Sequence, residues 1–387
     1  MVVVKAIYIW LVRFVSILNY FSRSKDRQVV YLMSFGNNLN FIARLADALP
    51  DRNQLLVLYR PSVEVEATEL AALGIPVMPF QDNVHFVLEG VPKIMQARLI
   101  FCDNYYAFLG GLVHPRHAKI VQLWHANGAI KRFGWGDPKT VQRSKTDQRR
   151  FQRVYNQFDD YVVASQAMGK VFEESYRVPA KRMQLLGYPR SDRFFSEDWK
   201  QTAVRRVQRV APDLLTHRVI LYAPTYRENM HFELSKDLKE ALMADPDAVV
   251  VVKLHPVLQK YEQQFSQASH HQIRFYPNLS TTDLLAVSET LITDYSSIAF
   301  DFSLLSSAHS LLFYMSDLEA YAQNPGIQPH FVKWLPTPPL KTPAELKQAI
   351  IADQATDYSA FNHHWNTYND GQATQRVVTY YCDYLGK

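Results

Sequence analysis

The stretch AVVVVKLHP, residues 248–256, indicates what kind of fold to expect. Five apolar, mostly β-branched residues run without a polar break, as in a strand that is buried on both faces of a parallel sheet. A lysine and a histidine then follow almost at once. Because ligands of open α/β proteins bind at the carboxyl ends of such strands, Lys253 and His255 mark a candidate site.

Four more segments end in short polar motifs in the same way. Histidine, lysine, arginine and small hydroxyl side chains recur in them, and such groups bind and polarise phosphate. If these strand ends converge on one crevice, they form an active site with phosphate chemistry. The four segments are KIVQLWHA (119–126), GYPR (187–190), RVILYAPTYR (218–227) and LITDYSS (291–297).

Short apolar runs alternate with helical stretches along most of the chain, which predicts parallel sheets with crossover helices. A charged stretch without strand signals, 191–216, divides the runs into two groups. We therefore expect an α/β protein with two Rossmann-like domains facing a cleft, at 25–195 and 196–387. The second domain ends in a helix at about 360–385, which can pack back across both domains. The expected strands are 29–35, 55–59, 76–80, 98–103, 119–125, 161–165, 218–223, 248–254, 272–276, 290–293 and 310–314.

Length and composition fit this architecture, because 387 residues suffice for two domains and 48% apolar residues are ordinary for a folded protein. Cys102 and Cys382 cannot form a disulfide framework, so we expect both to be reduced, as in a cytosol-facing protein. No Gly-x-Gly-x-x-Gly follows the first strand, which argues against a dinucleotide dehydrogenase. No cofactor is expected. A metal is not required either, since neither an Asp-x-Asp pair nor zinc-spaced ligands occur.

The net charge of +5 matters less than its distribution. Between residues 131 and 153, eight basic residues stand against two acidic ones, and a second basic stretch lies at 200–209. These stretches are solvated helix faces, or they attract anionic lipid headgroups or a pyrophosphate-bearing acceptor. Nucleic acid is a poorer choice of partner, because no nucleic-acid-binding motif accompanies the charge.

Residues 1–24 form an apolar N-terminal segment that Lys5 and Arg13 interrupt. The position of the charges argues against a cleaved signal peptide and against a membrane-spanning helix. Two interpretations remain. One is an amphipathic helix at a membrane surface, with Trp10 and Phe14 at headgroup depth; the other is a helix packed on the protein.

His125 is the candidate general base. It follows a buried strand, and an imidazole with an ordinary pKa of about 6.5 can accept a proton from an acceptor hydroxyl at neutral pH. The alternative is a structural histidine that hydrogen-bonds the turn. The surrounding motifs favour the catalytic interpretation.

The other basic motif residues are candidates for binding phosphate. Lys253 and His255 are expected to stabilise charge on a transferring phosphoryl group, with His255 counted among the catalytic residues. Arg190 follows a Gly-Tyr-Pro turn, and its guanidinium can hold a phosphate bidentately. Thr225 and Arg227 occupy an equivalent strand end in the second half of the chain.

The last motif offers hydroxyls and carboxylates. Ser296 and Ser297 are expected to cap a helix over 298–305, and a helix N-terminus with free N–H groups binds anions. Asp301 is expected to accept hydrogen bonds from hydroxyl groups of a ligand, which by the resemblance described below are those of glycerol or ribose. Asp294 can do the same or orient a histidine.

In order and spacing, the five motifs resemble those of the CDP-glycerol glycerophosphotransferases of teichoic acid synthesis. Members of that family carry a Trp-His-Gly-like block, Gly-Tyr-Pro-Arg, Ala-Pro-Thr-aromatic-Arg, Lys-Leu-His-Pro and Thr-Asp-Tyr-Ser-Ser, followed by Phe-Asp-Phe. The resemblance covers roughly residues 98–322. It implies a glycosyltransferase-B fold, a CDP-glycerol donor site at second-domain positions that include Thr293, and peripheral attachment to the cytoplasmic face of the cell membrane. This attachment favours the interpretation of residues 1–24 as an amphipathic, membrane-associated segment.

One motif departs from the family pattern. Here Trp124-His125 is followed by Ala126-Asn127, where polymerising members more often have Gly-Thr-Pro after the histidine. This variant is more similar to members that add a first unit. We therefore expect a primase of wall teichoic acid that transfers glycerol phosphate from CDP-glycerol to an undecaprenyl-diphosphate-linked disaccharide and releases CMP.

Several alternatives stay open. Within the family, the chain can be a polymerase or a CDP-ribitol enzyme. A sugar-nucleotide glycosyltransferase has the same fold, although an obvious Glu-x7-Glu pair is missing from the second half. A scaffold that binds lipid-linked precursors without catalysis is a third class, and neither the acceptor nor the oligomeric state follows from the sequence.

Overall fold

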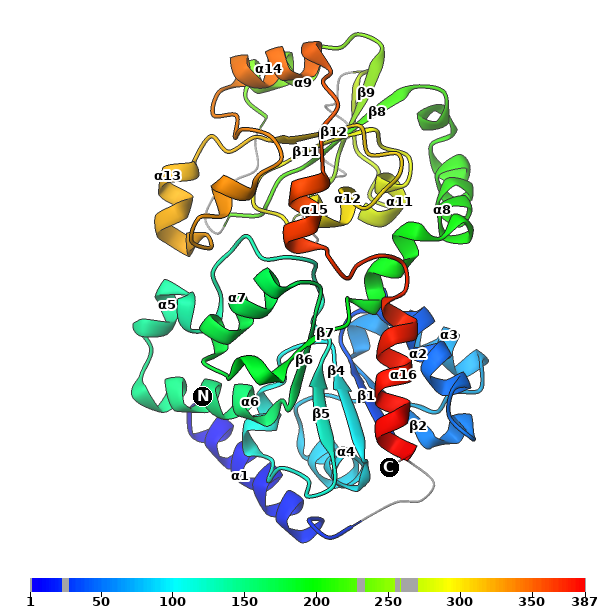
Figure 1. Ribbon diagram of the computed structural model, residues 1–387, viewed down its shortest axis with the longest axis vertical. Coiled ribbons are helices and arrows are strands. Elements are labelled where there is room, and N and C mark those ends of the chain that lie inside the picture. Colours follow the sequence, from blue (N-terminus) through cyan, green and yellow to red (C-terminus); the bar gives the residue numbers. More distant parts are fainter. Residues whose placement is uncertain (1, 23–27, 228–233, 255–257, 259–270, 387) are drawn as a thin grey trace. The chain divides into compact units, whose positions relative to one another are not determined.

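The computed structural model of the chain describes residues 2–22, 28–227, 234–254, 258 and 271–386. It divides into two compact units, and both are drawn in Figure 1. The passage from one unit to the other at Asp192–Arg193 lies close to the predicted boundary. Unit 1 comprises Met1–Ala126, Phe133–Asp192 and Thr367–Lys387, and unit 2 comprises Asn127–Arg132 and Arg193–Asn366.

Unit 1 is built on a seven-stranded parallel sheet with the strand order β3-β2-β1-β4-β5-β6-β7. Its strands are β1 (Val29–Met33), β2 (Leu55–Tyr59), β3 (Val77–Pro79), β4 (Leu99–Cys102), β5 (Lys119–Gln122), β6 (Asp160–Val163) and β7 (Met183–Leu185). Its helices are α1 (Val2–Leu18), α2 (Leu39–Asp47), α3 (Glu64–Ala72), α4 (Val84–Gln96), α5 (Pro138–Val141), α6 (Lys145–Gln157), α7 (Gln166–Tyr176) and α16 (Ala373–Gly386).

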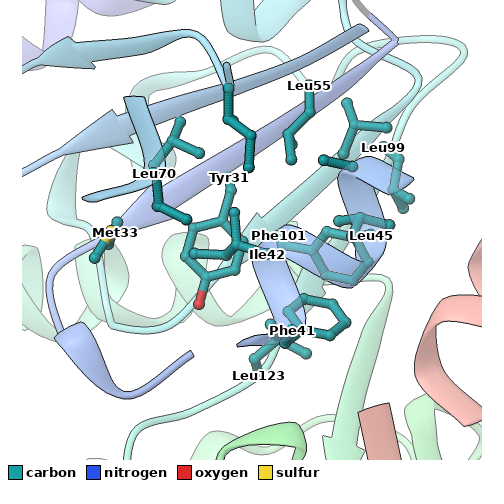
Figure 2. Close-up of a cluster of buried hydrophobic side chains, with 14 of the residues drawn as sticks. Tyr31, Met33, Phe41, Ile42, Leu45, Leu55, Leu70, Leu99, Phe101 and Leu123 are labelled. Atoms are coloured by element: carbon teal, nitrogen blue, oxygen red, sulfur yellow. The ribbon is translucent and has the colours of Figure 1, made fainter. Parts of the chain in front are cut away.

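A cluster of buried aromatic and aliphatic side chains joins this sheet to α2, α3 and α16. Figure 2 shows Tyr31, Phe41 and Phe101 meeting there. The ring of Phe101 lies edge-on to Phe41, with centroids 5.4 Å apart, and edge-on to Tyr381 of α16 at 5.2 Å. Each such pair contributes about 0.5–1.5 kcal/mol beyond the area it buries. Helix α16 is therefore part of the core of unit 1.

The predicted final helix differs from the structure in its extent. The structure has two helices there, α15 (Ser359–Trp365) and α16, instead of one over 360–385. The prediction counted this helix with the second domain and allowed it to pack back on the first, and Thr367–Lys387 belongs to unit 1. The reason is the burial of Val377 and Tyr381 in the core of unit 1.

Unit 2 contains a five-stranded parallel sheet with the order β10-β9-β8-β11-β12. Every residue of β9, the strand in the AVVVV stretch, is buried, which confirms its prediction as an interior strand. The strands are β8 (Arg218–Ala223), β9 (Ala248–Val252), β10 (Ile273–Arg274), β11 (Thr290–Thr293) and β12 (Ser310–Phe313). The helices are α8 (Glu197–Val210), α9 (Lys236–Leu242), α11 (Thr281–Leu285), α12 (Ile298–Phe302), α13 (Leu318–Tyr321), α14 (Pro343–Ala352) and α15.

The predicted α/β fold with two parallel sheets is confirmed, and each predicted strand coincides with an observed one. Strand β7 was missed, because it is only three residues long, partly exposed, and carries no run of β-branched residues. The predicted helix over 298–305 is shorter than expected, since α12 ends at Phe302. The hydroxyl of Ser303, the next residue, bonds the Phe300 carbonyl at 3.0 Å, as serine does near helix ends.

Helix α1 packs on unit 1 along one face, against α4 and the 3-10 turn η4 (Ala107–Gly111). Val12 is fully buried there, and the Ser16 hydroxyl accepts the Val113 N–H at 3.0 Å. A Cβ at Gly111 would lie 2.8 Å from the Ile9 carbonyl oxygen, so glycine permits this close approach. The helix is thus packed on the protein, as one of the two interpretations of residues 1–24 proposed. Among the helices that the structure describes, none is long and apolar enough to span a bilayer.

Candidate functional site

In unit 1, His125 lies with Phe35, Asp103 and Trp124 at the carboxyl ends of β1, β4 and β5; we call these four residues the histidine cluster. The three strands are neighbours in the sheet, which brings together residues that are distant in the sequence. The chain leaves β5 through Trp124, whose φ of 62° lies in the left-handed region. A bulky residue there is strained, and such strain is typical of functional turns.

The histidine cluster determines which nitrogen of His125 is basic. Nδ1 lies 3.2 Å from the backbone carbonyl oxygen of Asp103. A carbonyl only accepts hydrogen bonds, so Nδ1 carries the proton of the neutral ring and Nε2 keeps a lone pair. The ring also stacks on Phe35, with centroids 4.4 Å apart, and lies against Trp124 at 4.2 Å. His125 is therefore held in the tautomer of a general base.

The charge state of His125 fits the same role. Burial lowers its pKa from the ordinary 6.5 to about 4; the hydrogen bond to the Asp103 carbonyl opposes this shift, and the positive charge of Arg190 adds to it. At neutral pH the imidazole is consequently uncharged. An anionic phosphate bound nearby would raise the pKa again, because it favours the imidazolium.

The buried carboxyl of Asp103 is a residue that the sequence analysis missed. It accepts the backbone N–H groups of Ser34 at 2.9 Å and Phe35 at 3.0 Å, and the Tyr106 hydroxyl at 2.8 Å. Burial raises its pKa to about 7, although these hydrogen bonds oppose the shift. Asp103 thus fixes the loop that carries Phe35 and, through its own carbonyl, the ring of His125. The detectable signal was an aspartate directly after an apolar strand.

Arg190 lies in the same unit, buried at 7% exposure, in the 3-10 segment η7 (Pro189–Phe195). The preceding turn needs its glycine, since Gly187 has a φ of 81° and a Cβ would collide with the Tyr368 carbonyl oxygen. The Tyr188 N–H donates to Oδ1 of Asn369 at 2.8 Å. This anchored turn brings the guanidinium close enough for its charge to lower the pKa of His125.

The predicted residues of unit 2 meet around Arg227, at the carboxyl ends of β8, β11 and β12. Its guanidinium binds Oδ2 of Asp294 at 2.9 Å and, through Nε, Oδ2 of Asp317 at 2.7 Å. The Tyr295 hydroxyl donates to Asp317 at 3.0 Å. We call these four residues the arginine cluster. Asp317, which follows β12, was not predicted.

Most donors of Arg227 are used inside the protein. Its Nη1 donates to the Thr225 carbonyl at 2.6 Å, and its Nη2 also reaches Oδ1 of Asp317 at 3.0 Å. Burial opposes the charge of Arg227, but the bonds to Asp317 and Asp294 prevail and raise its pKa. A guanidinium has five N–H donors, and four now have protein acceptors. Arg227 was expected to bind substrate; the structure shows it joining the strand ends.

Thr225 and Asp294 lie on either side of this ion pair. Oδ1 of Asp294 accepts the N–H of Thr225 at 2.8 Å and that of Tyr295 at 2.6 Å. The Thr225 hydroxyl is buried and has no hydrogen-bond partner within the described ranges. A buried hydroxyl without a partner costs about 1–3 kcal/mol, which a ligand could offset. Thr225 is the clearest ligand-binding candidate in unit 2.

Lys131 is a further residue of this site that the sequence analysis placed elsewhere. It was counted in the basic run, but it belongs to unit 2, where its backbone pairs with Ile327. Lys131 is exposed as a residue, yet protein atoms near its ammonium lower its pKa; the charge of Asp294 opposes this shift and that of Arg227 adds to it. A cation therefore lies beside the arginine cluster.

The hydroxyls of two predicted residues in the last motif, Thr293 and Ser296, bond the protein backbone. The buried Thr293 hydroxyl donates to the Ala223 carbonyl at 2.8 Å, so it links β11 to β8. The Ser296 hydroxyl accepts the Ile298 N–H at 3.4 Å, a weak cap, and Ser297 precedes α12 without a side-chain capping bond in the described part. Since α12 has five residues, its dipole is small.

Lys253 follows β9 as predicted and is buried at 8% exposure. Its ammonium donates to the Tyr276 carbonyl at 3.3 Å. Strand β9 is next to β8, so Lys253 lies at the same edge of the sheet as Thr225. His255, the second predicted catalytic residue, lies outside the described residues.

Asp301 has a partner that the sequence did not indicate. Its Oδ1 accepts Nδ2 of Asn127 at 2.7 Å, and both residues are buried. Next to it, Gly128 has a φ of 57°, and a Cβ there would collide with the Phe300 ring. This packing attaches the segment Asn127–Arg132 to unit 2, directly after the histidine motif. Asp301 was expected to bind hydroxyls; its observed contact is structural.

The two clusters differ in chemistry. The histidine cluster offers a neutral base, and the arginine cluster offers paired charges, a buried hydroxyl and nearby cations. Within the described part of the chain, no group of three or more His, Cys, Asp or Glu side chains is arranged to hold a metal ion. Proton transfer and binding of an anionic, hydroxyl-bearing ligand are what these side chains can perform.

A sequence profile of the CDP-Glycerol:Poly(glycerophosphate) glycerophosphotransferase family matches residues 76–382 of the chain. The teichoic acid glycerol-phosphate primase of Bacillus subtilis (strain 168) is 29% identical over 369 residues, which cover 92% of this chain and 91% of the primase. The teichoic acid ribitol-phosphate primase of Bacillus spizizenii is 30% identical over 298 residues, 74% of this chain and 75% of that protein.

Solved structures extend the likeness to three dimensions. The wall teichoic acid polymerase TagF superposes with a TM-score of 0.70 at 16% identity, covering 96% of this chain and 94% of that one. The H444N variant of TagF has also been solved after a soak with CDPG. At this identity the likeness shows the fold, and that fold is the glycosyltransferase-B type that the sequence predicts.

Proposed function

The chain belongs to the CDP-Glycerol:Poly(glycerophosphate) glycerophosphotransferase family, enzymes of teichoic acid synthesis, and on that premise we propose that it performs the priming step. In this proposal it transfers glycerol phosphate from CDP-glycerol to a membrane acceptor, an undecaprenyl-diphosphate-linked disaccharide, and releases CMP. The observation that carries the proposal is the His125 ring, neutral at pH 7, with Nδ1 bonded to a carbonyl and Nε2 left basic.

The proposed chemistry uses His125 as the general base. An acceptor hydroxyl gives its proton to Nε2 while its oxygen attacks the β-phosphorus of CDP-glycerol. The bond between that phosphorus and the bridging oxygen breaks in line, and the electron pair leaves with CMP. Proton transfer of this kind contributes about 10² to 10⁴ in rate.

Donor binding is assigned to basic and hydroxyl groups that can contact phosphate and sugar. In unit 2 these are the Thr225 hydroxyl and the ammonium groups of Lys131 and Lys253, around the arginine cluster. In unit 1, Arg190 is near His125 and suits a phosphate that takes part in the reaction. His255 stays a prediction on sequence grounds.

Priming is preferred to polymerisation because of the relatives' names and matches. A glycerol-phosphate primase is 29% identical over 92% of this chain, whereas a poly(ribitol-phosphate) polymerase is 28% identical over 73% of it. The Ala126-Asn127 variant after the catalytic histidine points the same way. A ribitol-phosphate primase is the second candidate, because a relative of that name is 30% identical over three quarters of its length.

Attachment to the cytoplasmic face of the membrane is part of the proposal. Helix α1 buries Val12 against unit 1 yet leaves Trp10 61% exposed on its other side. Helix α6 and the residues before it add exposed basic side chains, among them Arg143, Arg149 and Arg153. Apolar insertion and attraction to anionic headgroups can act together at one surface.

The decisive experiment offers the protein CDP-glycerol, CDP-ribitol and a sugar nucleotide separately, each with a short-chain undecaprenyl-diphosphate-linked disaccharide. Mass spectrometry counts the units added, and chromatography identifies the nucleotide released. One glycerol-phosphate unit and stoichiometric CMP are expected. Long products would indicate a polymerase, and turnover only with CDP-ribitol would indicate the second candidate. No turnover with any donor would contradict the proposal.

A further inference from the structure

A cavity of about 280 Å³ in unit 1 is lined by residues from α1, from α6 and from the segments near them. Both helices can be located in Figure 1. None of the predicted site residues lines it. Its volume is close to the lower end of the roughly 300–1,000 Å³ typical of small-ligand pockets, which suits a headgroup better than a whole lipid. The side chains that matter for its chemistry are Lys5 and Tyr8 of α1, Asp82, Arg143, and Asp147 and Arg150 of α6.

The basic side chains of the cavity have charge available for an anion. Within the part of the chain that the structure describes, neither Lys5 nor Arg143 forms an ion pair, and the guanidinium of Arg143 lies 5.4 Å from the Phe151 ring centroid. Arg150 is 3.5 Å from the carboxylate of Asp147, a long contact that leaves N–H donors for another acceptor.

The two acidic side chains of the cavity are already engaged. Asp82 pairs with Arg60 at 2.7 Å and accepts the Tyr8 hydroxyl at 3.3 Å. Asp147 accepts the Ser144 hydroxyl at 2.9 Å at the start of α6. With these carboxylates bonded to neighbours, the cavity has a net positive character and complements an anion.

Helix α1 presents an apolar face beside the same cavity. Six large apolar residues, spaced mainly three or four apart, are between 47% and 70% exposed, although the opposite face of the helix is buried on unit 1. This pattern places an apolar surface next to basic side chains. Such a surface is complementary to a phospholipid, in which apolar acyl chains adjoin an anionic headgroup. The residues are Val4, Ile7, Trp10, Phe14, Ile17 and Leu18.

We propose that the cavity binds the phosphate headgroup of an anionic glycerophospholipid, with the acyl chains lying against the exposed face of α1. Lys5, Arg143 and Arg150 would contact the phosphodiester, which has one negative charge and two unesterified oxygens. This differs from diffuse attraction to a charged surface, because the phosphate group itself is recognised. The inference rests on the membrane attachment proposed above, but not on the transferase reaction.

The test compares two sets of phosphatidylcholine vesicles with the same zeta potential. One set contains phosphatidylglycerol; the other contains oleate, which is anionic but has no phosphate. The full chain is expected to prefer the phosphatidylglycerol vesicles by about tenfold in co-sedimentation affinity, the value of one charge-assisted hydrogen bond. Equal affinity for both sets would overturn the proposal.

Matched variants then test whether the preference for phosphatidylglycerol vesicles comes from the side chains that line the cavity. The double variant Arg143→Gln, Arg150→Gln should bind both vesicle sets equally. Its control, Arg149→Gln, Arg153→Gln, removes the same charge from exposed positions outside the cavity, and should weaken binding to both sets while the preference persists. Loss of the preference in the control as well would mean diffuse electrostatics and would overturn the proposal.

Two further measurements guard against misfolding and against a soluble ligand. Lys5→Gln alters only an exposed residue of α1, and should reduce the preference while the melting temperature is unchanged. Soluble glycerol 1-phosphate at millimolar concentration should leave the preference intact, because it has no acyl chains. Abolition of the preference by glycerol 1-phosphate would make this a site for free phosphate esters and would refute the lipid assignment.

Discussion

The histidine cluster and the arginine cluster occupy equivalent places, at the carboxyl ends of neighbouring parallel strands. They differ in charge: the first surrounds an uncharged ring, and the second surrounds a charged guanidinium with carboxylates. Around His125, burial and stacking on Phe35 favour an uncharged ring. Around Arg227, two carboxylates form ion pairs with a partly buried guanidinium. The same strand-end geometry therefore supports a neutral base in one unit and a set of paired ions in the other.

The difference shows that position in the sheet selects where chemistry can occur, and the immediate neighbours decide which chemistry it is. His125 has a backbone carbonyl as its hydrogen-bond partner, whereas Arg227 has the carboxylates of Asp294 and Asp317. A carbonyl orients a ring without adding charge; a carboxylate adds a counter-ion. Four substitutions test this comparison.

The largest effect is expected from His125→Ala. Removing the base should lower kcat by about 10² to 10⁴, while affinity for CDP-glycerol is nearly unchanged. Single-turnover kinetics and calorimetry measure the two quantities. If donor affinity fell as much as kcat, His125 would belong to donor binding or to the fold instead.

Arg227→Gln should affect folding more than chemistry. It leaves two carboxylates close together, with Asp294 buried, and should lower the free energy of unfolding by about 3 kcal/mol. Arg52→Gln is the control, because both side chains of the Arg52–Asp47 ion pair are 47% exposed, and should cost less than about 1 kcal/mol. Denaturant titration compares them. Equal losses would mean that the arginine cluster is an ordinary surface network.

Asp103→Asn should have a moderate effect on rate. The amide replaces an acceptor of two backbone N–H groups by one oxygen and an N–H₂ group that cannot accept, which loosens the Phe35 loop. We expect kcat to fall about tenfold with KM unchanged, as for a residue that positions the base. Asp103→Glu should not restore kcat, because the longer side chain moves the carboxylate away from the N–H groups of Ser34 and Phe35. A changed KM with an unchanged kcat would place Asp103 in substrate binding.

The smallest effect is expected for Arg190→Gln on the pH profile. In the free enzyme, kcat/KM should fall as the pH drops towards about 4, where His125 becomes protonated. Arg190 disfavours the imidazolium, so its loss should raise the pKa of His125 and move the acid limb to higher pH by less than about one unit. A shift to lower pH would contradict the proximity of the two side chains.

The fold was predictable because most of its strands can be recognised from short stretches of sequence. Unbroken β-branched runs such as 248–252 become interior strands, and their alternation with helices predicts parallel sheets. Residues 183–185 carry no such pattern and form an edge strand only because β6 offers them a ladder to join. The location of α16 was equally hidden, since an apolar helix face does not say which sheet it will cover.

A candidate site residue was predictable where its position directly after one strand is enough to identify it. It was not predictable where its role depends on which strands are neighbours in the sheet. His125 follows a strand directly, so its place was visible in the sequence. Asp103 matters because β4 lies between β1 and β5, and Asp317 because β12 adjoins β11, which no local pattern reveals. Lys131 was classed by its charge among its neighbours, but its contacts assign it to the other unit.

Helix α16 also imposes an order of events during synthesis. The ribosome makes every residue of unit 2, up to Asn366, before it makes the helix that completes the core of unit 1. Most of unit 1 is translated first, but its Phe101 ring lacks its contact with Tyr381 until α16 has been synthesised. Unit 2 can therefore complete its folding before unit 1 does. A nascent chain stalled after Asn366 would thus contain a complete unit 2 and a unit 1 that still lacks α16. Chaperones that bind exposed apolar surface would then bind unit 1, the part that is synthesised first.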